Sequence, residues 1–388
     1  MVVGCAAAPV LPIGDQGQPF RPDPDEQELW SQAEREAATL ARTGKLWDDP
    51  RVEQYLSGIV ARLTPLGMRA AGAPAVRISI LRNPRVSAFA LPNGRLYLHT
   101  GLLARLETEA QVATVLSREL AHVSQRHALR RERETLDGPS LAAAAEASQA
   151  TSAWRARGLR LALLAAVDGF GRRIEREADA ESMESLPRGG YDPREAPEAW
   201  GRLRHEVPSD TEHMERFLLE DGCWLDRRLA GARAWLRARA ATLDPSRLIR
   251  DTEDFRSTIL PVARENAALE LRAGRFEAAR AQLDRVLAAA PRDAVAHLYD
   301  GDLHRLRAQR ARQPGDERVL LDQARQAYER AAAVDPGYAE PFRQLGLLHY
   351  QRGDVHGAGD AFRTYLRMRP EAPDARRIRE YLAEIERR

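Results

Sequence analysis

The chain has 388 residues, enough for two or three domains and at least one sizeable hydrophobic core. Charged residues make up 30% and hydrophobic residues 44%, and a formal net charge of +2 gives no support for a nucleic-acid partner. The two cysteines, Cys5 and Cys223, exclude a disulfide framework, and no apolar run reaches the ~18–20 residues of a membrane-spanning helix.

Residues 1–24 are predicted to form a tail without regular structure. The sequence VVGC, which ends at Cys5, resembles the lipobox of bacterial lipoproteins, whose cysteine is acylated and becomes the N-terminus. The Pro/Gly/Gln/Asp-rich stretch that follows is typical of a flexible tether. We therefore expect a lipoprotein-like tail with Cys5 as the lipidation site. The alternative is a chance match, because the charged and apolar regions of a signal peptide do not precede the cysteine.

The next part of the chain combines helical and strand patterns. Amphipathic periodicity predicts helices over 25–44 and 50–66. Alternating apolar and polar residues predict a strand over 75–81. Residues 86–101 are predicted to form two strands around an Asn-Gly pair, which is a strong hairpin signal.

A long helix is predicted to follow, and it contains SRELAHVSQRH at residues 117–127. This segment differs by one residue from the helical HExxH motif, because Arg118 stands where the first histidine belongs. In that motif, two imidazoles four residues apart hold Zn²⁺, and the glutamate activates the bound water. Glu119 and His122 stand in the general-base and second-ligand positions.

The start of the motif helix and two later helices are also predicted from the sequence. Thr108 begins a capping-box pattern at the start of the motif helix. Helical patterns also cover 152–170 and 172–186, and the breaker cluster PRGGYDP ends the second of them. Within it, Glu175 and Asp179 are four residues apart and share one helical face.

The C-terminal part carries repeats. Pro336 and Pro370 are separated by one full period of the tetratricopeptide repeat. The interval from Pro291 to Pro336 exceeds one period by about a third of a repeat. We place this excess at 307–319, as a polar insertion between the two helices of the middle repeat. Because each helix pair must stack to bury its apolar face, an all-α solenoid is expected over 255–388.

Four ordered segments resemble the HtpX/BepA-like gluzincin metallopeptidase family: 88–103, 118–127, 175–179 and 189–193. The repeats resemble the tail of family members that act as periplasmic proteases and chaperones in outer-membrane protein assembly. The resemblance covers about residues 25–245. It implies a mostly α fold with a small β-sheet, an α+β zincin-like domain, in front of the repeats.

The resemblance also implies roles for individual residues. Four have catalytic or zinc-binding roles: Glu119 as general base, His122 and Glu175 as second and third zinc ligands, and Asp179 as a supporting acid. A strand formed by Ala88, Phe89 and Ala90 would border the substrate groove and pair with an extended peptide.

Arg118 departs from this family at the first ligand position. A catalytic zinc has three protein ligands and a water. An arginine keeps its proton and offers no lone pair, so the substitution costs roughly 3 kcal/mol or more of zinc binding. We expect a degenerate site in which Arg118 pairs with Glu175 or Glu119.

Other histidines are candidate replacements for the missing ligand. His127 is five residues from His122 and is predicted to point elsewhere on the helix. His205 and His213 precede residues 217–233, where the family's Thr-His-Pro segment is missing. One of these two histidines could swing toward the metal position.

Three functions follow from these alternatives. The first is a pseudopeptidase, or strongly impaired protease, that binds unfolded or assembling envelope proteins through its groove and repeats. The second is an active zinc metalloendopeptidase in envelope protein quality control, and only then would zinc be its cofactor. The third is a repeat scaffold whose N-terminal half is only structural. The expected location is the periplasm, with an outer-membrane tether if Cys5 is acylated.

Overall fold

The computed structural model describes residues 10–14, 19–136, 171–205 and 223–387. The chain divides into two compact units, Met1–Ile259 and Leu260–Arg388. No helix in the described ranges is both long and apolar enough to span a bilayer. The helix predicted over 152–170 and the lipidation site Cys5 lie outside the described residues.

A three-stranded sheet forms the centre of the first unit. Its strands are β1 (Arg77–Leu81), β2 (Ala88–Ala90) and β3 (Arg95–His99), in the order β1-β3-β2. β3 pairs in parallel with β1 and antiparallel with β2. The predicted hairpin turn is confirmed: Gly94 has a φ of 84°, and a Cβ there would lie 2.8 Å from the carbonyl oxygen of Ala75.

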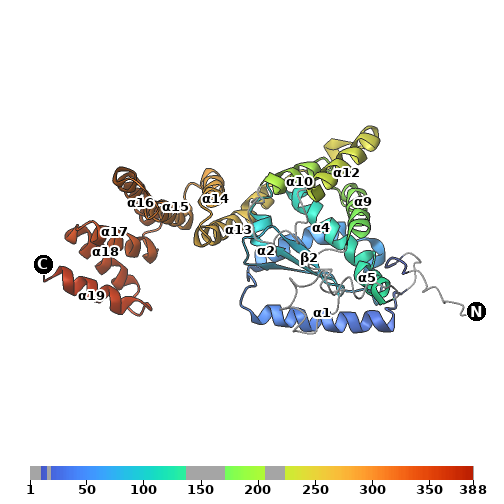
Figure 1. Cartoon of the computed structure of the whole chain (residues 1–388), viewed down its shortest axis with the longest axis horizontal. Coiled ribbons are helices and arrows are strands. Elements are labelled where there is room, and N and C mark those ends of the chain that lie inside the picture. The colour runs from blue at the N-terminus through green and yellow to red at the C-terminus, as the bar shows by residue number, and fades with distance from the viewer. Residues whose placement is uncertain (1–9, 15–18, 137–170, 206–222, 388) are drawn as a thin grey trace, which may run out of the picture. The chain divides into compact units, whose positions relative to one another are not determined.

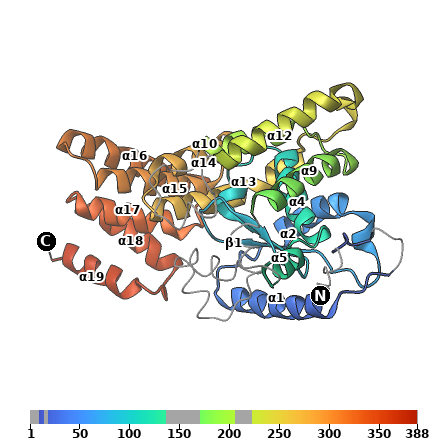
Figure 2. The same cartoon turned by 45° about the vertical axis from the view of Figure 1, so that its right-hand side comes forward.

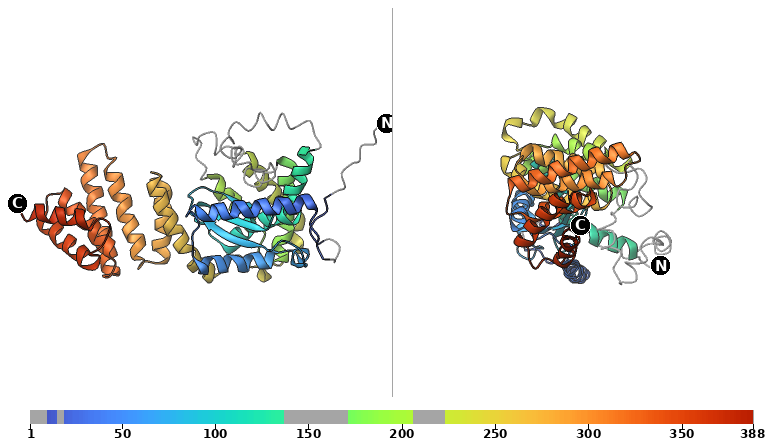
Figure 3. Two further views of the ribbon diagram at one scale, coloured as in Figure 1. Left: turned by 90° about the horizontal axis from the view of Figure 1, so that it is seen from below. Right: turned by 90° about the vertical axis from the view of Figure 1, so that its left-hand side faces the viewer.

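Helices cover both faces of this sheet (Figures 1 and 3). On one face, Phe89 and Tyr97 stack with ring centroids 5.1 Å apart and pack against Leu29 and other residues of α1 (Pro24–Arg42). The alternate side chains of the strands are also buried. α2 (Pro50–Leu63) contacts β1, and α4 (Glu109–Ser124) contacts β2. The mostly α fold with a small sheet is therefore confirmed.

Five further α-helices and three 3₁₀ turns complete the described part of this unit. The helices are α3 (Thr100–Leu103), α5 (His127–Leu136), α9 (Arg172–Arg188), α10 (Glu195–His205) and α12 (Cys223–Arg239). The 3₁₀ turns are Leu66–Arg69, Ala240–Thr242 and Pro245–Arg247.

The first turn of α4 is fixed by buried polar groups. Thr108 caps the helix by accepting a hydrogen bond from the backbone N–H of Gln111, at 3.3 Å, as the sequence predicted. The buried carboxylate of Glu109 accepts hydrogen bonds from the hydroxyls of Tyr55, Tyr191 and Thr252, at 2.5, 2.8 and 2.6 Å. These contacts join α4 to three distant segments and so fix the helix that carries the motif.

The second unit is all α. Its helices are α13 (Glu253–Arg272, which begins in the first unit), α14 (Phe276–Ala289), α15 (Ala294–Ala308), α16 (Pro314–Val334), α17 (Ala339–Gln351), α18 (Val355–Met368) and α19 (Ala375–Ile385). From α14 to α19, each helix contacts the next one along the chain, as in stacked repeats.

Two glycine–aromatic contacts locate the insertion in the repeats. A Cβ at Gly301 would lie 2.4 Å from the ring of Tyr328, and one at Gly346 would lie 2.4 Å from the ring of Phe362. More residues separate Gly301 from Tyr328 than separate Gly346 from Phe362. The difference in length equals the excess over one repeat that the spacing of Pro291 and Pro336 predicted. Much of it lengthens a helix, because α16 has 21 residues whereas α18 has 14.

Candidate functional site

The predicted site residues come together where α4 and α9 lie side by side (Figures 1 and 2). α4 carries Arg118, Glu119 and His122, and α9 carries Glu175 and Asp179. Glu119, His122 and Glu175 are buried, while the side chain of Asp179 is 22% exposed. The four-residue spacings on both helices therefore put the charged groups of the motif in one place.

The Arg118 guanidinium lies among three carboxylates. It donates to Glu119 Oε1 from Nη1 at 2.7 Å, to Asp179 Oδ1 from Nε at 3.1 Å, and to Glu175 Oε2 from Nη2. The sequence predicted a pair with Glu175 or Glu119, and both pairs are present. Such charge-assisted hydrogen bonds are about twice as strong as neutral ones, and they engage all three nitrogens of the guanidinium.

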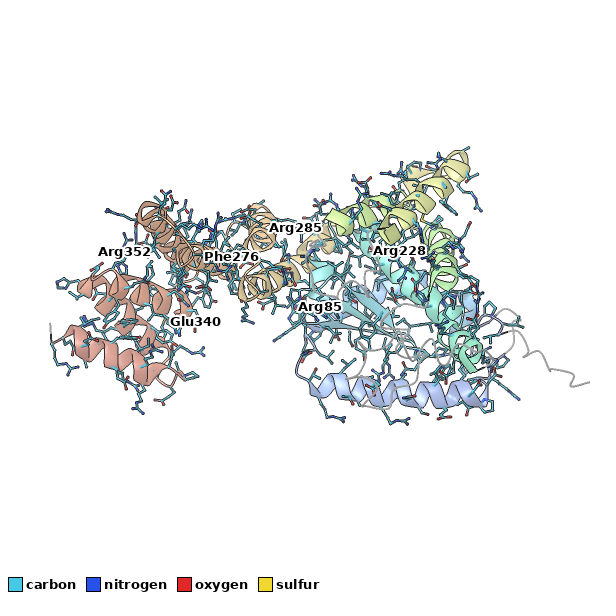
Figure 4. The ribbon with its side chains drawn as sticks, in the orientation of Figure 1. Arg85, Arg228, Phe276, Arg285, Glu340 and Arg352 are labelled. Carbon is cyan, nitrogen blue, oxygen red and sulfur yellow. The ribbon has the colours of Figure 1, made fainter. Side chains whose placement is uncertain are left out.

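A second arginine, Arg228 on α12, which is labelled in Figure 4, contacts two of these three carboxylates. Its Nη2 lies 3.0 Å from Glu175 Oε2 and its Nε lies 3.4 Å from Asp179 Oδ1. Its guanidinium carbon is 5.4 Å from the ring centroid of Trp200, which supports the side chain from α10. Sequence reasoning missed Arg228, because nothing in the helical pattern of 217–233 shows which arginine faces the site.

The two histidines of the motif segment lie in contact. The prediction that His127 points away from His122 is wrong: their Nδ1 atoms are 3.0 Å apart. The reason is that α4 ends at Ser124 and the chain turns through Arg126, whose φ is 54°. An ion pair of Arg126 with Glu26, at 2.6 Å, holds this uncommon conformation.

Burial controls protonation within the site. It lowers the pKa of His122 well below its usual value, and the nearby Arg118 guanidinium acts in the same direction. Burial raises the pKa of Glu119, while the Arg118 charge opposes that shift. Burial also lowers the pKa of Arg118, yet arginine side chains in proteins keep their proton. The site therefore holds a neutral imidazole beside two guanidinium cations.

This donor set does not fit a catalytic zinc ion. His122 Nε2 and Glu175 Oε2 are 3.9 Å apart, but Arg118 and Arg228 both donate to that same carboxylate oxygen. Within the described ranges, no three His, Cys, Asp or Glu side chains are arranged to hold a metal ion. The first ligand position is occupied by Arg118, a cation without a lone pair, whereas a catalytic zinc ion needs three protein donors.

The other predicted site residues belong to elements other than α4 and α9 or lie outside the described residues. Ala88, Phe89 and Ala90 form β2, an edge strand of the sheet, with Phe89 and Ala90 buried and Ala88 half-buried. Phe89 belongs to the core beneath α1. His205 is the last residue of α10, whereas His213 and residues 217–222 lie outside the described residues; the rest of the 217–233 stretch belongs to α12.

His99, at the end of β3, supplies a test of pH dependence. Its side chain is buried edge-on against Phe89, and burial lowers its pKa from 6.5 to about 4. Between these values the unfolded chain binds the proton and the folded chain does not, so stability falls as the pH falls.

We expect the contribution of His99 to the free energy of unfolding to decrease by about 2–3 kcal/mol between pH 7 and pH 4.5. Urea unfolding of the parent and a His99→Gln variant at both pH values measures it. The variant should lose less stability than the parent on acidification. An equal loss in both would contradict the neutral state of the buried imidazole.

Comparisons with known proteins agree with this architecture. The sequence model of peptidase family M48 matches residues 50–241, and a tetratricopeptide-repeat model matches residues 317–383. The beta-barrel assembly-enhancing protease of Escherichia coli K12 is 26% identical over 228 residues, covering 56% of this chain and 44% of that protein. The protein of the same name from Yersinia pestis is 30% identical over 161 residues, covering 38% of this chain and 32% of that protein.

A mitochondrial protein is also similar to part of this chain. The mitochondrial metalloendopeptidase OMA1 of Arabidopsis thaliana is 32% identical over 129 residues, covering 32% of this chain and 25% of that protein. The chain spans less than half the length of each of these three relatives. It contains a peptidase family M48 domain over residues 50–241, carries tetratricopeptide repeats in its C-terminal unit and is homologous to the beta-barrel assembly-enhancing proteases.

Proposed function

We propose that this protein is a pseudopeptidase, or a strongly impaired peptidase, of the bacterial cell envelope that binds unfolded or assembling envelope proteins. Family M48 consists of zinc-dependent metallopeptidases, so the family expectation is hydrolysis. One observation supports the proposal that this chain has lost or largely lost hydrolysis: the Arg118 guanidinium forms ion pairs with Glu119, Glu175 and Asp179.

These bonds oppose both requirements of zinc-dependent hydrolysis. The metal needs three donors, and the first of them is replaced by a cation that also binds the carboxylate of Glu175. The general base needs a free carboxylate, and Glu119 accepts a hydrogen bond from Arg118. Peptide binding has no such requirement, because the edge strand β2 and the helical repeats do not depend on the metal.

The location and partners follow from weaker observations. The relatives from Escherichia coli and Yersinia pestis are named as beta-barrel assembly-enhancing proteases, and this name suggests the outer membrane as the place of action. The lipobox-like sequence that ends at Cys5 would tether the protein to that membrane if the cysteine is acylated. We therefore place the protein in the periplasm, with unfolded or assembling β-barrel proteins as its partners.

Unfolded β-casein tests this function directly. We expect the full chain to bind fluorescein-labelled β-casein, measured by fluorescence anisotropy, and to leave it uncleaved after overnight incubation with added zinc. Any trace of cleavage should persist in a Glu119→Gln variant and so derive from a contaminant. Cleavage that Glu119→Gln abolishes would instead establish the alternative, an active zinc metalloendopeptidase. Absence of casein binding would overturn the binding role.

A further inference from the structure

A cavity of about 400 Å³ opens within the repeat unit, between α13, the start of α14 and α15. This volume lies in the lower part of the range of ligand pockets, which is about 300–1,000 Å³. Leu271, Phe276 and Leu306 supply apolar lining from the three helices. The cavity can therefore take one large apolar side chain.

The charged lining of the cavity is unbalanced. Arg272, Arg305 and Arg310 face a single carboxylate, Asp302. Asp302 is already matched, because its Oδ1 accepts from Arg305 at 3.1 Å and from the hydroxyl of Tyr328 at 2.9 Å. Among residues 260–387, no carboxylate lies within ion-pair distance of Arg272 or Arg310. Two cations of the cavity thus lack a counter-charge.

Arg310 lies in the polar insertion at 307–319 of the repeat unit, and this insertion has no role in the peptidase-like site described above. Its guanidinium carbon lies 4.6 Å from the ring centroid of Phe276, which is labelled in Figure 4. Gly274 has a φ of +73°, and a Cβ there would lie 2.8 Å from Arg310 Nη2, so the glycine leaves room for the guanidinium. The aromatic contact orients the cation without neutralising it. The insertion therefore adds a positive charge to the wall of the cavity.

We propose that this cavity binds an extended peptide segment in which two acidic side chains flank one large apolar side chain. The apolar side chain would cover Leu271, Phe276 and Leu306, and the two carboxylates would pair with Arg272 and Arg310. Arginine suits this role because its planar guanidinium binds a carboxylate through two parallel hydrogen bonds. A free C-terminal carboxylate would match only one of the two cations, so side-chain carboxylates fit the excess of two charges. The proposal deepens the client binding proposed above and rests on it.

A short peptide tests the cavity in the full-length protein. The probe is the fluorescein-labelled, C-terminally amidated peptide Gly-Ser-Asp-Phe-Glu-Ser-Gly, measured by fluorescence anisotropy. We expect it to bind, and to bind at least tenfold more weakly to the Arg272→Gln/Arg310→Gln double variant. Binding to the parent should weaken as salt is added. Arg292→Gln is the matched control: Arg292 is an exposed arginine that does not line the cavity, and this variant should bind like the parent.

The outcomes separate this proposal from its alternatives. No binding of the acidic peptide by the parent, or equal binding by the double variant, would overturn the cavity site. A neutral Asn-Phe-Gln peptide with a free C-terminus is the second probe. If it binds as tightly as the acidic amidated peptide, the cavity recognises the C-terminal carboxylate of a chain, and the proposal is overturned. β-Casein distinguishes the two proposals. A parent that binds the peptide but not casein contradicts the client role, and one that binds casein but not the peptide contradicts only the cavity.

Discussion

Replacing Arg118 by histidine is expected to give a chain that binds one zinc ion per molecule, at least about 100-fold more tightly than the parent. The new imidazole would restore the third donor beside His122 and Glu175, which the fold already brings to within 3.9 Å of each other. It would also release Glu119 from its bond with the guanidinium. Competition with a zinc-sensitive dye measures both affinities.

We expect that zinc binding also restores peptide hydrolysis in this variant. Arg118→His is expected to cleave β-casein, and the Arg118→His/Glu119→Gln variant is expected to bind zinc without cleaving, because it lacks the general base. Zinc should also raise the melting temperature of Arg118→His but not that of the parent. A parent chain that binds zinc as tightly as the variant would refute the view that Arg118 disables the site.

Features set by local chemistry were predictable from the sequence. The Asn-Gly turn before β3 and the Thr108 cap of α4 depend on a few neighbouring residues, and both are present. The meeting of Arg118 with Glu175 was also predictable, because the four-residue helical spacings and the family resemblance supplied the pairing of two distant helices. The turn and the cap were therefore readable from residues close in sequence, whereas the pairing of the two helices required the family resemblance.

Features that depend on the packing of segments distant in the sequence were not predictable. Arg228 reaches the carboxylates because α12 packs against both α9 and α10, and helical periodicity does not specify that packing. His127 returns to His122 because Arg126 adopts a positive φ, and the ion pair that stabilises it comes from Glu26, 100 residues away. In both cases the decisive partner lies far off in the chain.

The carboxylates around Arg118 also make it a structural residue. Glu119 is buried, and Arg118 is its ion-pair partner, at 2.7 Å. Glu175 would keep Arg228 if Arg118 were lost. Removing the guanidinium therefore leaves mainly Glu119 as an uncompensated buried charge, and the cost of breaking a buried pair in this way is about 3–5 kcal/mol.

Arg118→Met is thus expected to lower the free energy of unfolding by about 3–5 kcal/mol, and Arg118→Met/Glu119→Gln should recover most of that loss. Urea denaturation followed by circular dichroism measures both. Arg133→Met is the matched control, because Arg133 pairs with Asp23 and Asp25 at a partly exposed site and should contribute no more than about 1 kcal/mol. If Arg118→Met and Arg133→Met cost the same, or if the second substitution at Glu119 gives no recovery, Arg118 does not hold the site together by charge compensation.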